Sequence, residues 1–154
     1  MRRIGWVAMG LILSGLITGC APVVTVQNTT RIPVRAFVWS GGRSEVLSPS
    51  PGESSSAEVS EGPYRVSVVP DQEWIEYAKA TRRYLNERLA DSDHLTGQQL
   101  LDVIRRLKDI AQRIQQFENA AGTGSGCRGK VSSEGGGLAT ISTSADGSLV
   151  VSCK

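Results

Sequence analysis

The sequence predicts an α+β fold, in which a small antiparallel β-sandwich carries an inserted antiparallel helical hairpin and a C-terminal β-hairpin. Residues 23–69 alternate apolar and polar side chains with the period of two that is typical of half-buried strands. Residues 71–121 instead place apolar side chains every three or four positions, which indicates helices. Residues 127–154 return to alternation on both sides of an Asp-Gly turn. We therefore expect the strands before and after the helices to complete one sheet structure, with two separate subdomains as the alternative.

The first β segment contains short apolar runs separated by Pro, Gly and Asn turns. Within it, Phe37 and Trp39 fall on the face opposite to Val34 and Val38, so we expect their strand to be covered on both sides. Gly62-Pro63-Tyr64-Arg65-Val66-Ser67-Val68 is similar to the closing strand of the small β-sandwich modules common on bacterial surface proteins. This resemblance covers a short part of the chain and implies a fold class. We expect strands near residues 24–26, 33–39, 45–47, 55–59 and 64–69.

Two helices are predicted within residues 71–121. Asp71 is placed as the N-cap of the first, and Thr96 followed by Gln99 has the spacing of a capping box for the second. At 1.5 Å per residue the helices are about 29 and 36 Å long, and their short connection predicts an antiparallel pair. Gly122 is expected to end the second helix. We expect the core-facing stripe of the second helix to include Leu100, Leu101, Val103, Ile104, Leu107, Ile110, Ala111, Ile114, Phe117 and Ala121.

Aromatic side chains are few in this chain, and each buries a large area when it packs. We therefore expect Trp39, Trp74 and the tyrosines to lie in the core. Residues 122–126 are rich in glycine and are interpreted as a flexible hinge.

The N-terminal residues have the pattern of an export signal. Arg2 and Arg3 precede an apolar run, and Leu16-Ile17-Thr18-Gly19-Cys20 follows it as a lipobox. The segment resembles the signal of bacterial lipoproteins. That resemblance implies cleavage after residue 19, a lipidated N-terminus over residues 20–22, and acyl chains on Cys20 that anchor the protein in a bacterial membrane. The protein would then face the periplasm or the cell exterior, and the alternative is an ordinary secretory signal with a chance cysteine.

Two further cysteines remain once Cys20 is assigned to lipid. An even pair in an exported protein predicts a disulfide between Cys127 and Cys153. The bond would close a loop of about 27 residues, for which the chain-entropy model gives roughly 3 to 4 kcal/mol. The alternatives are a metal pair or a redox pair, but no histidine lies nearby and the two thiols lack the C-x-x-C spacing.

Charge excludes one class of partner. Removing residues 1–19 leaves 135 residues and takes Arg2 and Arg3 from the 17 basic residues, so 15 basic residues face 15 acidic ones. Nucleic-acid binding requires a basic surface that displaces counterions, and we therefore expect no nucleic-acid partner.

The single histidine, His94, is a candidate for a catalytic or metal-binding residue. His94 stands beside Asp91 and Asp93, but it lacks a nucleophile with the right spacing, and the two aspartates lack the glycine and glutamate of a calcium loop. The glycine-rich segment also lacks the lysine of a phosphate-binding loop. We expect no catalytic residue, no metal site and no cofactor, so the chain is not predicted to be an enzyme.

Basic pairs on the helices are the remaining candidates for a binding site. Arg82-Arg83 and Arg105-Arg106 are interpreted as a solvated surface that Glu76, Glu87, Asp102 and Asp109 neutralise, or as a contact for an anionic lipid or an acidic partner.

The sequence thus favours a non-enzymatic binding or assembly module, anchored to the membrane through Cys20 and bound to another envelope protein. One alternative is a sensor or carrier of a small ligand, with a cleft between the sheet and the helices. Another is an envelope hydrolase, which requires an activated nucleophile that the sequence does not offer.

Overall fold

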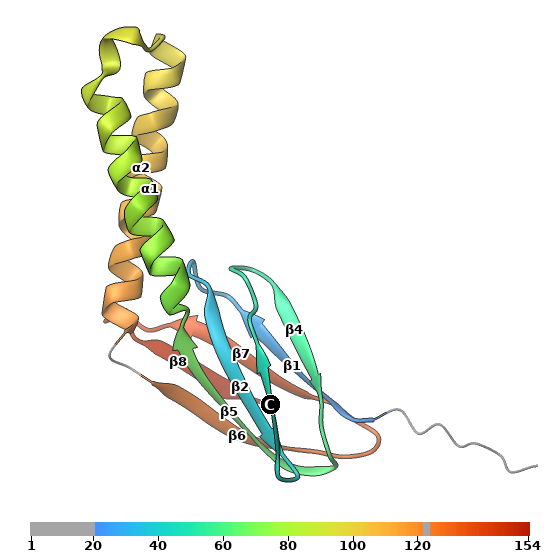
Figure 1. Cartoon of the computed structure of the whole chain (residues 1–154). Helices are drawn as coiled ribbons and strands as arrows, with labels where there is room; N and C mark the ends of the chain where they lie inside the picture. Colours follow the sequence, from blue (N-terminus) through green and yellow to red (C-terminus); the bar gives the residue numbers. More distant parts are fainter. Residues whose placement is uncertain (1–20, 122–123) are drawn as a thin grey trace, which may run out of the picture.

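The structure, a computed structural model, describes residues 21–121 and 124–154. The predicted signal peptide, Cys20 and Gly122 lie outside these residues. Within the described part, two β-sheets face each other and a pair of helices projects from one end of them (Figure 1). The predicted α+β class is confirmed.

Each sheet has four strands, with the order β4-β1-β7-β8 in the first and β3-β2-β5-β6 in the second. Neighbouring strands run antiparallel, except that β1 and β7 are parallel. The first sheet is therefore mixed, where the sequence suggested an antiparallel one, because β7 reaches it by crossing over from the other sheet. The strands are β1 (Val23–Asn28), β2 (Val34–Ser40), β3 (Arg43–Leu47), β4 (Ser54–Glu58), β5 (Gly62–Pro70), β6 (Ser125–Val131), β7 (Gly137–Thr143) and β8 (Leu149–Cys153).

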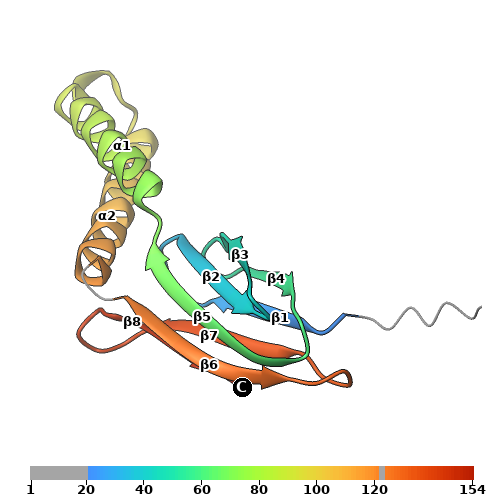
Figure 2. The same cartoon turned by 60° about the horizontal axis from the view of Figure 1, so that its bottom comes forward.

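The helices are inserted between two neighbouring strands of one sheet. The chain leaves β5 at Pro70, forms the helices, and returns as β6 to pair with β5, so that Val66 lies opposite Cys127. Strand β7 then pairs with β1. The strands before and after the helices therefore form one sandwich, as Figure 2 shows from a second direction.

Local sequence signals define the helices: α1 (Gln72–Ala90), a short 3₁₀ turn η1 (Ser92–His94), and α2 (Gly97–Ala120). The Asp71 side chain accepts a 3.1 Å hydrogen bond from the Glu73 backbone nitrogen, which confirms the first N-cap. The capping box is also confirmed, since Thr96 and Gln99 exchange side-chain-to-backbone hydrogen bonds of 2.9 and 3.4 Å. Both helices therefore begin where the sequence places them.

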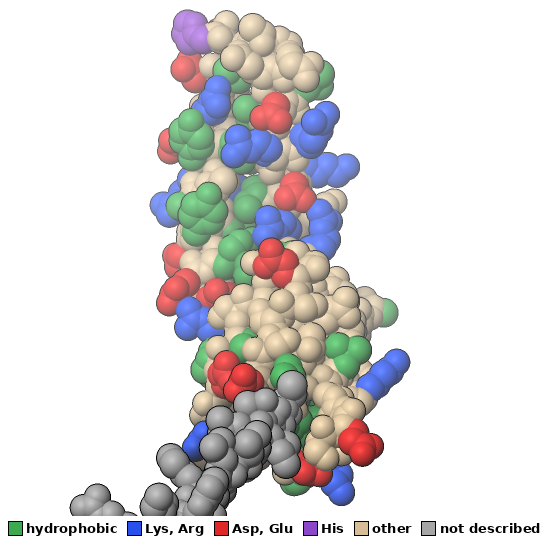
Figure 3. All heavy atoms as spheres, turned by 90° about the vertical axis from the view of Figure 1, so that its right-hand side faces the viewer, with side chains coloured by type: hydrophobic (Ala, Val, Ile, Leu, Met, Phe, Trp, Pro, Cys, Tyr) green, Lys and Arg blue, Asp and Glu red, His purple; other side chains and the backbone are tan. Residues whose placement is uncertain are grey.

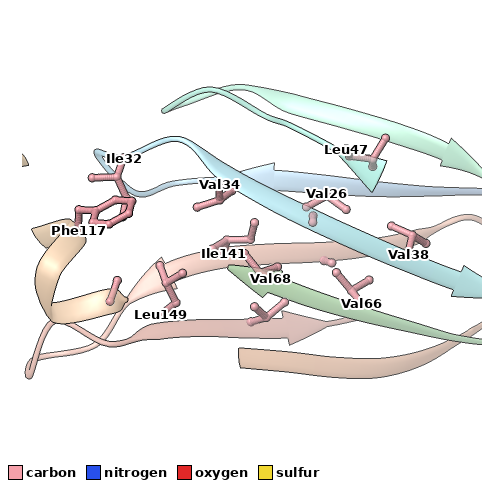
Figure 4. Close-up of a cluster of buried hydrophobic side chains, with 14 of the residues drawn as sticks. Val26, Ile32, Val34, Val38, Leu47, Val66, Val68, Phe117, Ile141 and Leu149 are labelled. Atoms are coloured by element: carbon pink, nitrogen blue, oxygen red, sulfur yellow. The ribbon is translucent and has the colours of Figure 1, made fainter. Parts of the chain in front are cut away.

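The core lies between the two sheets and extends under the end of α2 (Figure 4). Val34, Val66 and Val68 from one sheet face Val26 and Ile141 from the other, and all five are fully buried. These residues alternate with exposed or half-buried ones along their strands, as the period of two predicts. At the end nearest the helices, the core is continued by Ile32, Phe117 and Leu149.

A buried asparagine holds the loop that follows β1. The Asn28 amide donates to the carbonyl oxygens of Ile32 and Pro49, at 2.9 and 3.0 Å, and its Oδ1 accepts from the backbone nitrogen and hydroxyl of Thr30. A buried amide is stabilising only when its polar atoms have partners, and here they do. This network fixes the loop that later contacts α2.

Several expectations about burial are wrong. Trp39 is 39% exposed and Phe37 is only half-buried, because in the part of the chain that the structure describes no third layer covers the outer face of their sheet. Tyr77 and Tyr84 are 69% and 55% exposed, whereas Tyr64 is buried. The stripe on α2 is narrower than predicted, since its added members Leu101, Ile104 and Ala111 are exposed.

Part of the predicted glycine-rich hinge is a β-strand. Ser125 and Gly126 belong to β6, and residues 122–123 lie outside the described part of the chain. A Cβ at position 126 would lie 2.8 Å from the Val66 carbonyl oxygen on β5. Close approach to the neighbouring strand, rather than hinge flexibility, therefore explains this glycine.

Candidate functional site

The helical hairpin projects from the sandwich as an arm, defined as α1, η1 and α2. It is fixed at its base by the loop that follows β1. Arg31 forms an ion pair with Asp109 and a 3.1 Å hydrogen bond with Gln112, and Arg113 Nε donates a 3.0 Å hydrogen bond to the Arg31 carbonyl oxygen. Gln116 adds a 2.7 Å hydrogen bond to Thr143 of β7. Polar contacts from two strand ends therefore set the direction of α2.

The first turn of α1 has its own attachment. Arg35 on β2 forms ion pairs with Asp71 and Glu73, at 3.4 and 2.9 Å, and these two carboxylates raise the pKa of the Arg35 guanidinium. Trp74 packs against Phe117 with the ring centres 5.9 Å apart. Both helices are thus anchored at the same end, and the rest of the arm extends beyond the sandwich (Figure 1).

Beyond its base, the arm has one buried seam. Ala78 and Leu85 of α1 are buried together with Val103, Ile110 and Ile114 of α2. Figure 3 shows hydrophobic, basic and acidic side chains interspersed along the rest of the arm's visible face. Four large hydrophobic residues of the arm are strongly exposed, namely Tyr77, Tyr84, Leu101 and Ile104.

These exposed residues lie on two different sides of the arm. On one side the guanidinium of Arg113 lies 4.9 Å from the centre of the Trp74 ring, and Arg88 and Asp102 line one hollow further along. The helical repeat places Tyr77 and Tyr84 on this side of α1, between Trp74 and Arg88. We call this surface the tyrosine face; it comprises Trp74, Tyr77, Thr81, Tyr84 and Arg88 of α1 with Asp102, Arg106, Asp109 and Arg113 of α2.

The opposite side carries the exposed aliphatic residues. Leu101 and Ile104 are 58% and 47% exposed, and Lys108 and Ala111 follow them along α2 at spacings of four and three. On α1, the positions that flank the buried seam on this side are 79, 82 and 86. We call this surface the aliphatic face; it comprises Leu101, Ile104, Lys108 and Ala111 of α2 with Lys79, Arg82 and Asn86 of α1.

The four arginines predicted as a partner site lie at one level of the arm. Because α1 and α2 run antiparallel and Trp74 is level with Arg113, Arg82 and Arg83 are level with Arg106 and Arg105. Adjacent helical residues point about 100° apart, so the four side chains surround the arm rather than form one patch.

The expected neutralisation of these arginines does not take the form of close ion pairs within the described residues. All four are exposed, and within the described residues none of them forms an ion pair. Of the expected acidic partners, Asp109 is instead bound to Arg31 and Arg113 at the base of the arm. The middle of the arm therefore exposes four arginines that form no close ion pair with a described carboxylate.

The described N-terminal end of the chain lies far from the arm. Strand β1 begins at Val23 and ends at Asn28, beside the loop that holds α2. Its six residues, at about 3.3 Å each, span roughly 20 Å. Both views show the chain entering the sandwich at the end opposite to the helices (Figures 1 and 2).

A cleft of about 380 Å³ opens between the edge strands β3 and β4. Ala57 and Val38 lie at its floor, and Arg43, Glu45 and Glu58 supply charges at its rim. The cleft lies between the two sheets, whereas the sequence suggested one between the sheet and the helices. Its lining also includes Ala21, Ser40, Ser44, Val59 and Ser60.

A small aromatic patch lies on the outer face of the second sheet. Phe37 and Trp39 stack with their ring centres 5.9 Å apart, and the Arg65 guanidinium lies 5.6 Å from the Trp39 ring. Val46, on the neighbouring strand, is 54% exposed.

The histidine considered as a catalytic or metal-binding residue is at the tip of the arm. His94 is 81% exposed, and its Nε2 lies 3.8 Å from an Asp91 carboxylate oxygen. Among the described residues there is no group of three or more His, Cys, Asp or Glu side chains placed to hold a metal ion. In the described part of the chain, none of the helices is both long enough and apolar enough to cross a membrane.

Cys127 and Cys153 form the predicted disulfide. It joins β6 of one sheet to β8 of the other, with the two Cα atoms 5.6 Å apart. The bond therefore ties together the edges of the two sheets on the side away from the β3–β4 cleft.

Sequence reasoning missed the residues that attach the arm and the tyrosines that it exposes. The contact between Arg31 and Asp109 joins residues 78 positions apart, and no local pattern reports it. In the sequence, Tyr77 and Tyr84 stand beside the apolar stripe of α1 rather than within it. This position was the signal that could have predicted their exposure. The described chain is thus a two-sheet β-sandwich with an inserted helical arm. Comparisons with known protein families, characterised proteins and solved structures find no match.

Proposed function

We propose that this protein is a lipid-anchored envelope protein that acts as a non-enzymatic binding or assembly module, and that the arm contacts its partner. One observation carries the proposal. An arm about 36 Å long is attached at its base and exposes large hydrophobic residues along its length. Exposed apolar residues grouped on one surface are typical of an interaction site, and each face of the arm carries such a pair, Tyr77 with Tyr84 and Leu101 with Ile104.

The composition of the arm supports a protein as the partner. The tyrosine face combines Tyr77 and Tyr84 with Trp74 and with arginines from both helices. Tyrosine, tryptophan and arginine are the residues enriched at the centres of protein interfaces, where they contribute most of the binding energy. This face therefore has the composition of an interface centre.

The position of the N-terminus supports an arm that points away from the membrane. Val23 lies only three residues after Cys20, at the end of the sandwich opposite to the arm. Acyl chains on Cys20 would hold that end against the bilayer, since two or more chains are needed for stable attachment. The arm would then reach toward a partner beyond the membrane surface.

Affinity purification from membranes solubilised in mild detergent tests this role. The full-length protein should retain a partner protein, and the double substitution Tyr77→Ser with Tyr84→Ser should reduce its recovery by about tenfold or more. Val46→Ser provides the matched control, because Val46 is similarly exposed but lies on the sandwich. Recovery of the protein alone in several mild detergents, or equal loss with the control, would contradict the proposal.

A second candidate function is binding of a small ligand, and the β3–β4 cleft favours it. The cleft combines apolar residues at its floor with charged and hydroxyl groups at its rim, which is the composition of many ligand sites. Native mass spectrometry of the protein purified from its own membranes should then show a bound small molecule. The substitution Ser44→Trp, at the exposed wall of the cleft, should remove that mass, and an unliganded wild-type protein would count against this function.

A further inference from the structure

Helix α2 has two apolar seams, and only one of them packs against another element within the described residues. Val103, Leu107, Ile110, Ile114 and Phe117 alternate steps of four and three and pack toward α1. The second seam is Leu101, Ile104, Lys108 and Ala111, with steps of three, four and three. These steps are the spacing of heptad positions a and d, by which one helix packs against another. All four residues of the second seam are exposed.

Charge identifies the kind of helix that this seam fits. Lys108 occupies an a position, where a lysine in an apolar seam selects a partner with a complementary group. Arg105 lies beside the seam on α2, and Lys79 and Arg82 border it from α1. Within the described residues none of these cations has an ion-pair partner. The surface is therefore apolar along its centre and positive along its borders.

The same charges disfavour a second copy of this chain on the aliphatic face. Two such faces in contact would bring their unpaired cations together, and like charges across an interface are repulsive. Acidic side chains that border an apolar stripe would instead pair with Lys79, Arg82, Arg105 and Lys108. Attachment to the anchoring membrane is disfavoured by position, because the chain enters the sandwich at the end away from the arm.

We propose that the aliphatic face of the arm binds an acidic amphipathic helix of a partner protein, which completes a three-helix unit with α1 and α2. Leu101 and Ile104 provide the apolar contact. Lys108 sets the register of the bound helix, and Lys79, Arg82 and Arg105 pair with its acidic borders. This inference deepens the proposed binding role and rests on it, since it adds the aliphatic face to the tyrosine face as a contact surface and names the chemistry of the partner.

Photo-crosslinking in the cells that make the protein tests the inference on the full chain. The photoreactive residue p-benzoylphenylalanine replaces Ile104 or Lys108 on the aliphatic face, and Tyr84 on the tyrosine face. After irradiation, adducts are purified and the crosslinked peptide is sequenced by mass spectrometry. We expect adducts from positions 104 and 108 on an acidic amphipathic helix of another protein. The substitution Lys108→Glu should reduce the yield from position 104 about tenfold, and Lys130→Glu, on β6 of the sandwich, should leave it unchanged.

The remaining outcomes separate this inference from the proposed function. Adducts from position 84 alone would overturn the inference and leave the binding role intact, whereas adducts from none of the three positions would contradict both. Self-adducts, or adducts on a helix without acidic residues, would also overturn the inference. Vesicles of phosphatidylglycerol provide a last check: if the purified Cys20→Ser protein binds them and Lys108→Glu abolishes that binding, the face is a membrane contact. Circular dichroism and thermal unfolding should show that each variant remains folded.

Discussion

Arg113 on α2 stacks on Trp74 of α1, with its guanidinium 4.9 Å from the ring centre, and donates a 3.0 Å hydrogen bond to the Arg31 carbonyl oxygen. One side chain therefore contacts both helices of the arm and the loop that follows β1. Arg31 in turn pairs with Asp109 of α2. Because these contacts come from both helices and from the sandwich, they hold the arm in one direction relative to the sheets.

Replacing Arg113 should loosen the base of the arm. Arg113→Ala loses a cation–π contact and a hydrogen bond, which together contribute about 1–2 kcal/mol. We expect a lower denaturation midpoint, and a broader distribution of distances between spin labels attached at positions 44 and 94. Arg106→Ala is the control, because Arg106 is exposed on the same helix and forms no ion pair within the described residues. An unchanged distance distribution for Arg113→Ala would show that other contacts fix the arm.

The Asn28 network should be essential for stability. Asn28→Ala leaves the buried Pro49 carbonyl oxygen without its donor and the Ile32 carbonyl oxygen with the Thr30 hydroxyl alone, and we expect a loss of about 2 kcal/mol or more in the free energy of unfolding. Asn28→Asp has nearly the same shape and keeps the acceptor for Thr30, but it cannot donate, so it should also destabilise the fold. Urea denaturation measures both. Wild-type stability in the aspartate variant would contradict the assigned donor roles.

Two glycines make room for the buried ring of Tyr64. A Cβ at Gly129 would overlap the Tyr64 ring, and one at Gly137 would lie 2.7 Å from its hydroxyl oxygen. Gly129→Ala should therefore destabilise the fold by about 1–3 kcal/mol, because the buried ring would have to shift to admit the new methyl group. In Gly135→Ala the nearest atom to the new Cβ is 3.8 Å away, so thermal unfolding of this variant should match the wild type. Equal unfolding temperatures for all three proteins would refute the packing described here.

Tyr64 should also make stability depend on pH in the alkaline range. Burial raises the pKa of its phenol above the ordinary value of 10.0. Above about pH 10 the unfolded chain loses the phenol proton more readily than the folded protein does. The contribution of Tyr64 to the free energy of unfolding is therefore fully present below about pH 10 and falls as the pH rises further. In Tyr64→Phe this part of the loss should disappear. Urea midpoints measured at about pH 8 and about pH 11 test it, and an identical decline in both proteins would assign the loss to other groups.

The sequence predicted the features that depend on neighbouring residues. The alternation of Val34, Ala36 and Val38 located a strand because one face of that strand is buried. Thr96 and Gln99 located the start of α2 because a capping box is complete within four residues. The cysteine pair was predicted from the count of thiols and the expected export, and the structure contains the bond.

Features that depend on which elements meet in space were not predictable in this way. The width of the buried stripe on α2 depends on how many elements cover the helix, and an arm offers only α1 as a cover. Leu101 and Ile104 therefore looked like core residues although they are exposed. For the same reason, Trp39 looked buried, since the sequence does not report that its sheet lacks an outer layer.

Membrane fractionation of Cys20→Ser tests the central claim most directly. The wild-type protein should sediment with membranes and resist washing with high salt, because acyl chains on Cys20 hold it in the bilayer. The substituted protein should lack those chains whether or not its signal peptide is cleaved. Where an ordinary signal peptidase removes residues 1–19, its folded domain should be recovered in the soluble fraction. Metabolic labelling with a radioactive fatty acid should mark the wild type alone. Labelling of both proteins, or of neither, would contradict an anchor at Cys20.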